Sequence, residues 1–332
     1  EIVYFQEAER LDKWKRSTNW EILLKKYANE KFDEIVFVYA VGPKGYKNDY
    51  TEDTKQKIKD VFNFFNIKCD AFNIEKGHHF FHACSSFYNS GYDTSYCLVM
   101  DGWGLANENH DAEITSLYYF NKNKYKKIFQ VYSSPKEYVD GKTIYINTMS
   151  LGLLFEYGAN VFGYKEPGSV MGRSCFEQNF TPDSKFFKMY DTKFNHFVFT
   201  QAKVFNMTRE EKLLGCYIIQ RNAEDIILQY VNNIIKNKKR NLCVSGGVFQ
   251  NTVINSKILD ICPNLYVDPF ADDSGISMGA ALWKTNKNKF VKNKIDNLYL
   301  GDIPNYSVIS ELPKEKLKDV SYKDVAKLIS EK

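Results

Sequence analysis

Residues 241–251 read NLCVSGGVFQN, an order that predicts a buried strand, a double-glycine turn and the start of a helix. At this junction Gly246 and Gly247 lack the Cβ atoms that would keep a phosphate or a nucleotide away from the N-terminus of the helix. Asn251 stands where that helix is expected to begin. The stretch therefore predicts an α/β fold in which this turn binds an anion.

A second, acidic turn follows after one predicted helix and one predicted strand. The helix is expected at residues 251–260 and the strand at 265–267, and residues 272–275 then lead into a helix that carries Gly275 and Gly279. Glycines at this spacing allow a neighbouring backbone to approach the helix closely. The two turns, in this order along the chain, together indicate a nucleotide site.

Three of the five histidines lie in the stretch GHHFFHA at residues 77–83. His78 and His82 would face the same side of a helix, where two imidazoles can reach a single metal ion. A strand predicted for residues 67–74 would deliver the cluster to the edge of a sheet. Histidines that pack beside neighbouring phenylalanines would produce the same local sequence, so a metal site and core packing both remain open here.

A further buried strand, residues 95–100, ends in Asp101-Gly102-Trp103-Gly104. Glycines after such an aspartate let backbone N–H groups approach an anion, which is typical of phosphate-binding and metal-binding turns. The Asp-Gly pair is also common in β-hairpins. Because residues 113–120 and 125–132 predict a meander of strands, the hairpin alternative remains open too.

Composition favours a folded intracellular protein. The 332 residues are 44% hydrophobic and 16% aromatic, which is ample for a core, and the length predicts two domains or one two-lobed domain. The net charge is only +4, so the lysine runs at 122–127 and 236–240 are interpreted as solvated faces rather than a nucleic-acid groove. Seven scattered cysteines without a Cys-x-x-Cys pair favour a reduced, cytoplasmic protein.

No apolar run in the sequence reaches the roughly 18 residues that a membrane-spanning helix requires, so no membrane span is expected.

Hydrophobic periodicity and capping signals predict the remaining elements. Thr208 and Glu211 form a capping-box pattern, which predicts the start of a long helix that extends to about residue 239. The histidine stretch is expected to open a helix that ends near residue 88. Strands are also expected at residues 2–5 and 33–40, and helices at residues 20–27, 54–65 and 147–162.

Several stretches of the chain together match one enzyme family. They are Glu9-Arg10 with Lys15, residues 78–83, 98–104, 150–152 and 170–172, residues 245–248 with Asn251, and residues 273–275 with 279–282. They span nearly the whole chain in the order that this family has. The sequence therefore resembles the NodU/CmcH family of O-carbamoyltransferases.

The resemblance implies an ASKHA (actin/Hsp70-like) fold, an α/β architecture in which two RNase H-like lobes hold a nucleotide and a metal between them. Lobe I would comprise residues 1–94 and lobe II residues 95–282. Residues 283–300 would return toward lobe I, and residues 301–332 would lead into a YrdC-like C-terminal domain that the sequence does not include. The family's first strand would precede residue 1.

The resemblance also implies a metal site and a nucleotide site. Fe²⁺ is the metal expected by family precedent, with Zn²⁺, Mn²⁺ or Mg²⁺ as alternatives. Its implied ligands are His78, His82, Asp101 and Asp273. The residues implied to bind ATP are Gly246, Gly247 and Asn251, with Gly152 beside the phosphates. Lys15 would lie near the acceptor substrate, and His79 and Asp101 would act in catalysis.

The implied reaction has two steps, in which carbamoyl phosphate and ATP give carbamoyladenylate and an acceptor hydroxyl then takes the carbamoyl group while AMP leaves. The acceptor would be a small molecule or a nucleoside, and a modified nucleobase stays open. A tRNA threonylcarbamoyl transferase-like enzyme and a catalytically silent nucleotide-binding module are the alternatives. The family's lysine before Val170 is Ser169 here, and this chain alone is expected to be an incomplete enzyme. A homodimer without membrane or nucleic-acid partners is expected.

Overall fold

The computed structural model describes the following parts of the chain: residues 24–39, 52–108, 111–133, 137–139, 143–147, 150–176, 190–191, 196–200, 207–236, 238–292 and 294–295. The architecture of these residues is mixed α/β, as predicted. Lys15, the predicted strand at residues 2–5 and residues 301–332 lie outside them. Among the described residues, no helix has both the length and the apolar character needed to cross a bilayer. The lobe boundaries stay a prediction.

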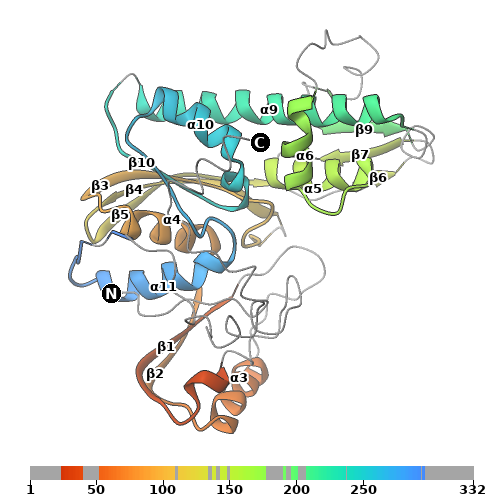
Figure 1. The fold of residues 1–332 in the computed structure, drawn as a ribbon. Helices are drawn as coiled ribbons and strands as arrows, with labels where there is room; N and C mark the ends of the chain where they lie inside the picture. Colours follow the sequence, from red (N-terminus) through yellow and green to blue (C-terminus); the bar gives the residue numbers. More distant parts are fainter. Residues whose placement is uncertain are drawn as a thin grey trace, which may run out of the picture. The chain divides into compact units, whose positions relative to one another are not determined.

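A five-stranded mixed sheet has the strand order β11-β10-β3-β4-β5 (Figure 1). The double-glycine turn at Gly246-Gly247 follows β10, and the acidic turn at residues 272–275 comes after β11. The predicted meander is confirmed, because β3, β4 and β5 pair antiparallel in sequence order, while β10 and β11 add on the other side parallel to β3. The residues of β10 are all buried. The bounds are Thr94–Met100 for β3, Ala112–Asn121 for β4, Lys124–Ser133 for β5, Leu242–Ser245 for β10 and Leu265–Val267 for β11.

One face of this sheet is covered by the histidine helix α4 (His78–Asn89), which contacts β3, β4 and β10. Helix α11 (Ser274–Asn286) packs against the outer side of α4 (Figure 1). The predicted close approach is confirmed, because a Cβ atom at Gly279 would overlap the carbonyl oxygen of Phe81. A larger residue at that position would therefore force the two helices apart.

The other face of the sheet is covered by a second set of helices, α9 and α10 among them (Figure 1). Side chains of α9 such as Ile219 and Ile227 share one hydrophobic core with Leu98 of β3 and Val244 of β10. The capping box at Thr208 is present, and α9 ends at Ile235, a few residues before the predicted end. The bounds are Leu151–Phe162 for α5, Gly168–Arg173 for α6, Arg209–Ile235 for α9 and Thr252–Ile261 for α10, with 3-10 turns at Ser174–Phe176 (η2) and Gly247–Gln250 (η3).

The predicted start of α5 at Asn147 is wrong. Asn147 is the last residue of strand β7 (Thr143–Asn147), and the helix begins at Leu151 with Ser150 as its N-cap. Strand β7 belongs to a four-stranded sheet with the order β6-β7-β9-β8. Its other members are β6 (Glu137–Val139), β8 (Tyr190–Asp191) and β9 (His196–Thr200). Asn147 and Ser150 are both residue types that favour helix N-caps, so the local sequence does not decide which of them precedes the first turn.

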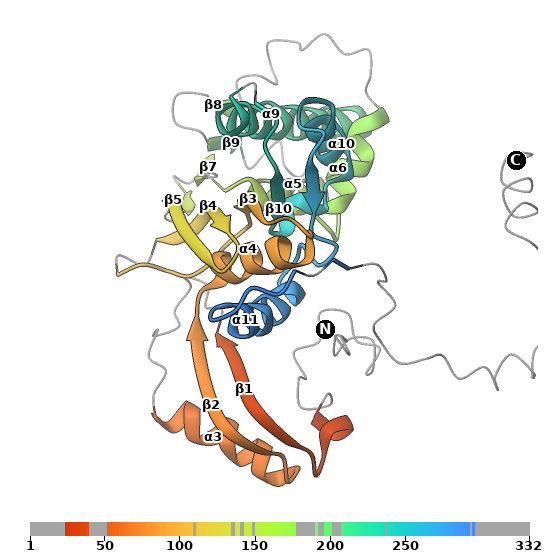
Figure 2. The same ribbon diagram turned by 90° about the vertical axis from the view of Figure 1, so that its left-hand side faces the viewer.

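The N-terminal part of the described chain contains two parallel strands, β1 (Lys31–Tyr39) and β2 (Lys68–Lys76) (Figure 2). The 3-10 turn η1 (Lys25–Tyr27) precedes β1, and helix α3 (Glu52–Phe64) connects the two strands; Ile58 and Phe62 of α3 are buried. Strand β2 leads directly into α4, as predicted. The ammonium of Lys284 on α11 lies 3.3 Å from a carboxylate oxygen of Glu34 and 2.5 Å from one of Glu75, which ties both strands to α11.

Candidate metal and nucleotide site

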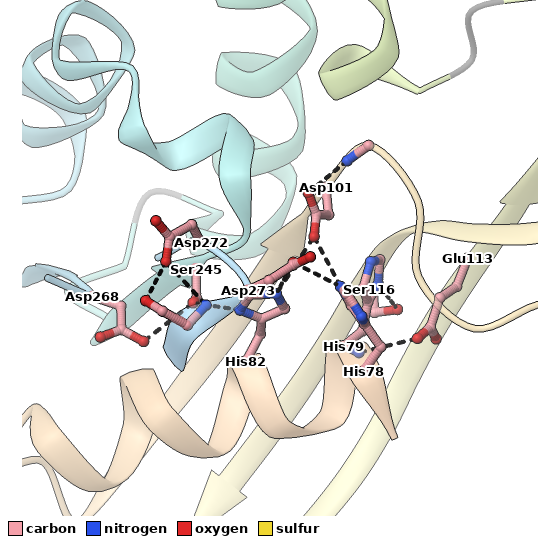
Figure 3. A network of polar contacts seen from close by, with 12 residues as sticks. His78, His79, His82, Asp101, Glu113, Ser116, Ser245, Asp268, Asp272 and Asp273 are labelled. Atoms are coloured by element: carbon pink, nitrogen blue, oxygen red, sulfur yellow. Dashed lines mark hydrogen bonds and ion pairs between the residues drawn. The ribbon is translucent and has the colours of Figure 1, made fainter. Parts of the chain in front are cut away.

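The four residues implied as metal ligands converge at the carboxyl edge of the five-stranded sheet (Figure 3). His78 and His82 project from α4, Asp101 follows β3, and Asp273 precedes α11. One nitrogen or oxygen atom of each side chain lies within 4.8 Å of the others. Two imidazole nitrogens and two carboxylate oxygens are a ligand set that first-row divalent metals bind well.

The distances within this four-residue cluster are short. Nε2 of His78 lies 2.9 Å from Oδ2 of Asp101 and 3.4 Å from Oδ1 of Asp273. Nε2 of His82 lies 3.4 Å and 3.6 Å from the same two oxygens. Because metal–ligand bonds of about 2.0–2.2 Å place tetrahedral ligand atoms roughly 3.3–3.6 Å apart, a first-row divalent ion fits this spacing with little adjustment.

Asp273 is free to serve as a ligand because its neighbour does the capping of α11. Oδ1 of Asp272 accepts a hydrogen bond from the backbone N–H of Ser274 at 3.1 Å, whereas Asp273 makes no side-chain capping bond. The Asp273 side chain is 71% exposed, while His78 and His82 are almost fully buried. The cluster is therefore accessible to solvent at Asp273.

The charges in the cluster favour a bound cation. Burial opposes protonation of His82, but the carboxylates of Asp101 and Asp273 outweigh it and raise the pKa of His82 to about 9. Burial likewise opposes ionisation of Asp101, but His78 and His82 outweigh it and hold the pKa of Asp101 well below its usual range. The same field that holds a proton on His82 would stabilise a divalent metal in its place.

His79 differs from its two neighbours, because its ring turns toward β4 (Figure 3). Its Nδ1 lies 2.8 Å from the hydroxyl of Ser116, and its Nε2 has no hydrogen-bond partner within the described parts of the chain. Burial, together with the charge of His78, holds the pKa of His79 well below its usual value, so the ring is neutral. Its predicted catalytic role stays a prediction.

Glu113 on β4 was not singled out by the sequence, yet it holds the start of the histidine helix. Its Oε1 accepts hydrogen bonds from the backbone N–H groups of His79, at 3.0 Å, and Leu105, at 3.1 Å, and its Oε2 accepts one from the amide of Gln130. A Cβ atom at Gly104 would overlap the Glu113 side chain. This buried carboxylate therefore fixes the α4 N-terminus relative to the loop after Asp101.

A cavity of about 220 Å³ adjoins the cluster, and Asp101 belongs to both. Gly152, Gly247 and Asn251, three of the four residues implied to bind the nucleotide, line this cavity together with apolar side chains that include Phe155, Met171 and Val248. Such a mixture of an apolar wall and a few polar groups is typical of small-molecule sites.

The glycines of this region have different roles. Gly246 is not among the residues that line the cavity; it has a φ of +97°, and a Cβ atom there would overlap the carbonyl oxygen of Met100. Glycine is therefore needed at position 246 by the backbone conformation of the turn and by its close contact with Met100, and not by contact with the cavity. A Cβ atom at Gly152 would overlap the backbone of Gly102, so Gly152 allows α5 to reach the turn after β3.

Ser150 secures the same contact. Its hydroxyl lies 3.0 Å from the carbonyl oxygen of Asp101 and 2.7 Å from that of Gly102, and it also accepts a hydrogen bond from the N–H of Leu153 at 3.2 Å. Ser150, the N-cap of α5, thus also holds the turn that carries Asp101.

Comparison with known proteins shows the family of this chain. The carbamoyltransferase N-terminus family matches residues 8–282, which is most of the sequence. The chain therefore belongs to the carbamoyltransferase N-terminus family.

Two curated relatives match parts of the chain. Nodulation protein NolNO of Sinorhizobium fredii (strain NBRC 101917 / NGR234) is 25% identical over 241 residues, which is 68% of this chain and 33% of that protein. Uncharacterized protein MJ1051 of Methanocaldococcus jannaschii is 30% identical over 115 residues, which is 34% of this chain and 21% of that protein. The chain thus spans a third or less of the length of these relatives.

Two solved structures of HypF are also similar. Full-length HypF in its phosphate- and nucleotide-bound form is 14% identical with a TM-score of 0.38, and the match covers 79% of this chain and 48% of that one. HypF of T. kodakarensis is 12% identical with a TM-score of 0.36, covering 71% of this chain and 39% of that one.

Proposed function

We propose that the described part of the chain forms the nucleotide and metal site of an ATP-dependent O-carbamoyltransferase. The observation that carries this proposal is the position of Asp101, which contributes both to the four-residue cluster and to the wall of the cavity. A nucleotide in the cavity would therefore have its phosphates beside the metal. Family membership supports carbamoyl transfer, and carbamoyl phosphate is the proposed donor.

The metal is proposed to be Fe²⁺, with Zn²⁺, Mn²⁺ or Mg²⁺ as alternatives, held by His78, His82, Asp101 and Asp273. When bound, it would neutralise phosphate charge and polarise the carbamoyl anhydride. The residues around the cavity support this role. Asp101 and Glu156 are the charged residues among those that line it, and no lysine, arginine or histidine in the described chain is among them. Among the described residues, the cluster with its metal is therefore the group that could offset the negative charge of ATP.

The five-stranded sheet is proposed to be the core of one of the two lobes of an ASKHA fold. An antiparallel meander followed by two parallel strands, with helices on both faces, supports this assignment. The cluster and the cavity lie where β3 and β10 end, which is where ligands bind in sheets of this kind. The lobe boundaries at residues 94 and 282 belong to the same proposal.

Calorimetric titration with ATP, in the presence and absence of the metal, tests the site. We expect ATP to bind the metal-loaded chain at least about tenfold more tightly than the metal-free chain, because phosphate charge is then neutralised. Asp101→Asn should abolish this dependence, whereas the exposed Asp260→Asn on α10 should not. ATP affinity that does not depend on the metal would contradict the shared site.

Mass spectrometry tests the transfer. Because this chain alone is expected to be an incomplete enzyme, hydroxyl-bearing acceptors would be incubated with a version of it extended to the length of its curated relatives, together with the metal, ATP and carbamoyl phosphate. One added carbamoyl group together with released AMP would support the proposal. An extended protein that binds metal and ATP but carbamoylates no small molecule, nucleoside or tRNA would be better described as carrying a silent nucleotide-binding module.

A further inference from the structure

A buried polar network lies behind the cavity, where α9 packs against α10. Gln220 and Glu224 on α9 are 1% and 2% exposed, and Asn251, which lines the cavity, is the N-cap of α10. A buried carboxylate near the middle of a helix is costly unless charged or polar groups compensate it. The network is thus a built feature directly adjacent to the cavity.

Glu224 is held in its ionised form. Nη1 of Arg221 lies 2.6 Å from its Oε2, and the ammonium of Lys257 on α10 contacts the same oxygen. Burial opposes ionisation, but Lys257, Gln220 and Arg221 outweigh it and lower the pKa of Glu224. An ionised carboxylate can only accept hydrogen bonds.

The acceptor character of Glu224 fixes the orientation of the next side chain. Nε2 of Gln220 donates to Oε1 of Glu224 at 2.9 Å, so the carbonyl oxygen of Gln220 faces Asn251 and accepts from its Nδ2 at 2.8 Å. A reversed Gln220 amide would place its oxygen against the Glu224 carboxylate. The polarity of Gln220 is therefore set by Glu224.

Asn251 is fixed from both sides. Its Oδ1 accepts from the backbone N–H of Ile254 at 3.1 Å and from Nε2 of Gln220 at 3.3 Å. A reversed Asn251 amide would set two donors against each other at Ile254. Within the described residues, the second hydrogen on Nδ2 is the one polar group of this side chain that has no partner. The side chain can therefore offer a ligand a donor but no acceptor.

We propose that Glu224 and Gln220 are positioning residues that hold Asn251 as a hydrogen-bond donor to an acceptor ring nitrogen of a purine in the cavity. This inference rests on the proposed function, since it takes the ligand to be a nucleotide with its phosphates at Asp101. The apolar wall that includes Phe155, Met171 and Val248 is then left for the base. A cavity with an apolar wall and one oriented hydrogen-bond donor favours those bases that place a hydrogen-bond acceptor opposite this donor.

Calorimetry with adenosine and with the deaza-adenosines, in each of which carbon replaces one acceptor ring nitrogen, tests the inference. We expect the wild-type chain to bind one of these analogues roughly 3- to 10-fold more weakly than adenosine, as the loss of one hydrogen bond predicts, and the others about equally well. In Glu224→Gln and Gln220→Leu the hydrogen bond from the Ile254 N–H is the one fixed restraint left on the Asn251 amide, so adenosine should lose part of its advantage over that analogue. The exposed Asp225→Asn, one residue along the same helix, should keep the wild-type discrimination.

Equal binding of adenosine and every analogue by the wild-type chain would overturn the inference, and this result needs no variant to fold. Unchanged discrimination in both Glu224→Gln and Gln220→Leu would overturn it as well. If neither adenosine nor ATP binds the wild-type chain, the proposed function fails first. Binding of ATP without discrimination among the analogues removes only the role of Asn251.

Discussion

Oγ of Ser245 lies 3.3 Å from Nδ1 of His82 and 3.2 Å from Oδ2 of Asp268, and all three side chains are buried (Figure 3). Asp268 also accepts a hydrogen bond from the backbone N–H of Phe270 at its other oxygen. Because the serine donates its one proton to the carboxylate, its oxygen accepts from His82 Nδ1–H. When a metal displaces the second proton of His82, Nε2 presents its lone pair toward Asp101 and Asp273, as a metal ligand requires.

Removal of this support should weaken metal binding without unfolding the chain. We expect Ser245→Ala and Asp268→Asn each to lower the affinity for Co²⁺, a spectroscopic substitute for the native metal, by about tenfold. Burial raises the pKa of Asp268, so the neutral asparagine should cost little stability. Titration followed by the visible spectrum measures the affinity, and thermal melting of the metal-free variants measures the stability.

The exposed Ser277→Ala on α11 is the matched control for Ser245→Ala. An unchanged Co²⁺ affinity in both Ser245→Ala and Asp268→Asn would show that the hydrogen-bond chain does not position His82.

Metal content gives a second prediction. The purified wild-type chain is expected to bind about one equivalent of divalent metal, and the double substitution His78→Ala/His82→Ala should lose it, because two of the four ligands are gone. Elemental analysis after desalting measures the stoichiometry. Ion content that is the same in wild type and double variant would refute the metal assignment, whatever the nucleotide affinity.

Local spacing in the sequence was enough to predict the two histidines of this site, but not the aspartate that joins them from the far end of the chain. The spacing of His78 and His82 determines which helix face they share, and the structure shows them on that face. Asp273 lies far away in the chain, so its place beside them followed from family resemblance and not from any local pattern. Its position depends on how α11 packs against α4.

Glu113, Ser245 and Asp268 were missed for the same physical reason. Each acts across elements, from β4 to α4 or from β10 and the turn after β11 to α4, and hydrophobic periodicity carries no information about such pairings. The one available signal was the charge of Glu113 inside a strand whose other residues are largely apolar or buried. Glu224 was missed because a glutamate in a long helix usually faces solvent, although its spacing to Ile227 and Val231 places it on the buried side of α9.

The pH dependence of the metal-free chain follows from His82. Its pKa is raised from 6.5 to about 9 on folding, chiefly by Asp101 and Asp273 against the opposing effect of burial. A group with a raised pKa contributes stability that is fully present below pH 6.5 and is lost as the pH rises through about 9. The stability difference between wild type and His82→Gln should therefore shrink between these two pH values.

Denaturant unfolding of both proteins across this pH range, with a chelator present, measures the difference. Because metal binding must displace the His82 proton, the apparent metal affinity of the wild-type chain should rise over the same range. A stability difference that grows with pH would contradict the assigned direction of the shift.

Gly279 gives the most direct test of the packing that carries the site. A Cβ atom at Gly279 would overlap the carbonyl oxygen of Phe81 and lie 3.0 Å from the backbone nitrogen of Ser85, so neither neighbour is a flexible side chain. Gly279→Ala should therefore destabilise the chain by about 1–3 kcal/mol, the usual cost of overpacking. The displaced α4 carries His78 and His82, so metal affinity should fall as well.

Gly172→Ala on α6 is the matched control, because nothing lies within 4 Å of its added Cβ, and alanine there should be neutral or stabilising. Denaturant melts of both variants together with Co²⁺ titration decide the point: equal stability of the two would mean that α4 and α11 are not in the close contact that brings Asp273 to the histidines.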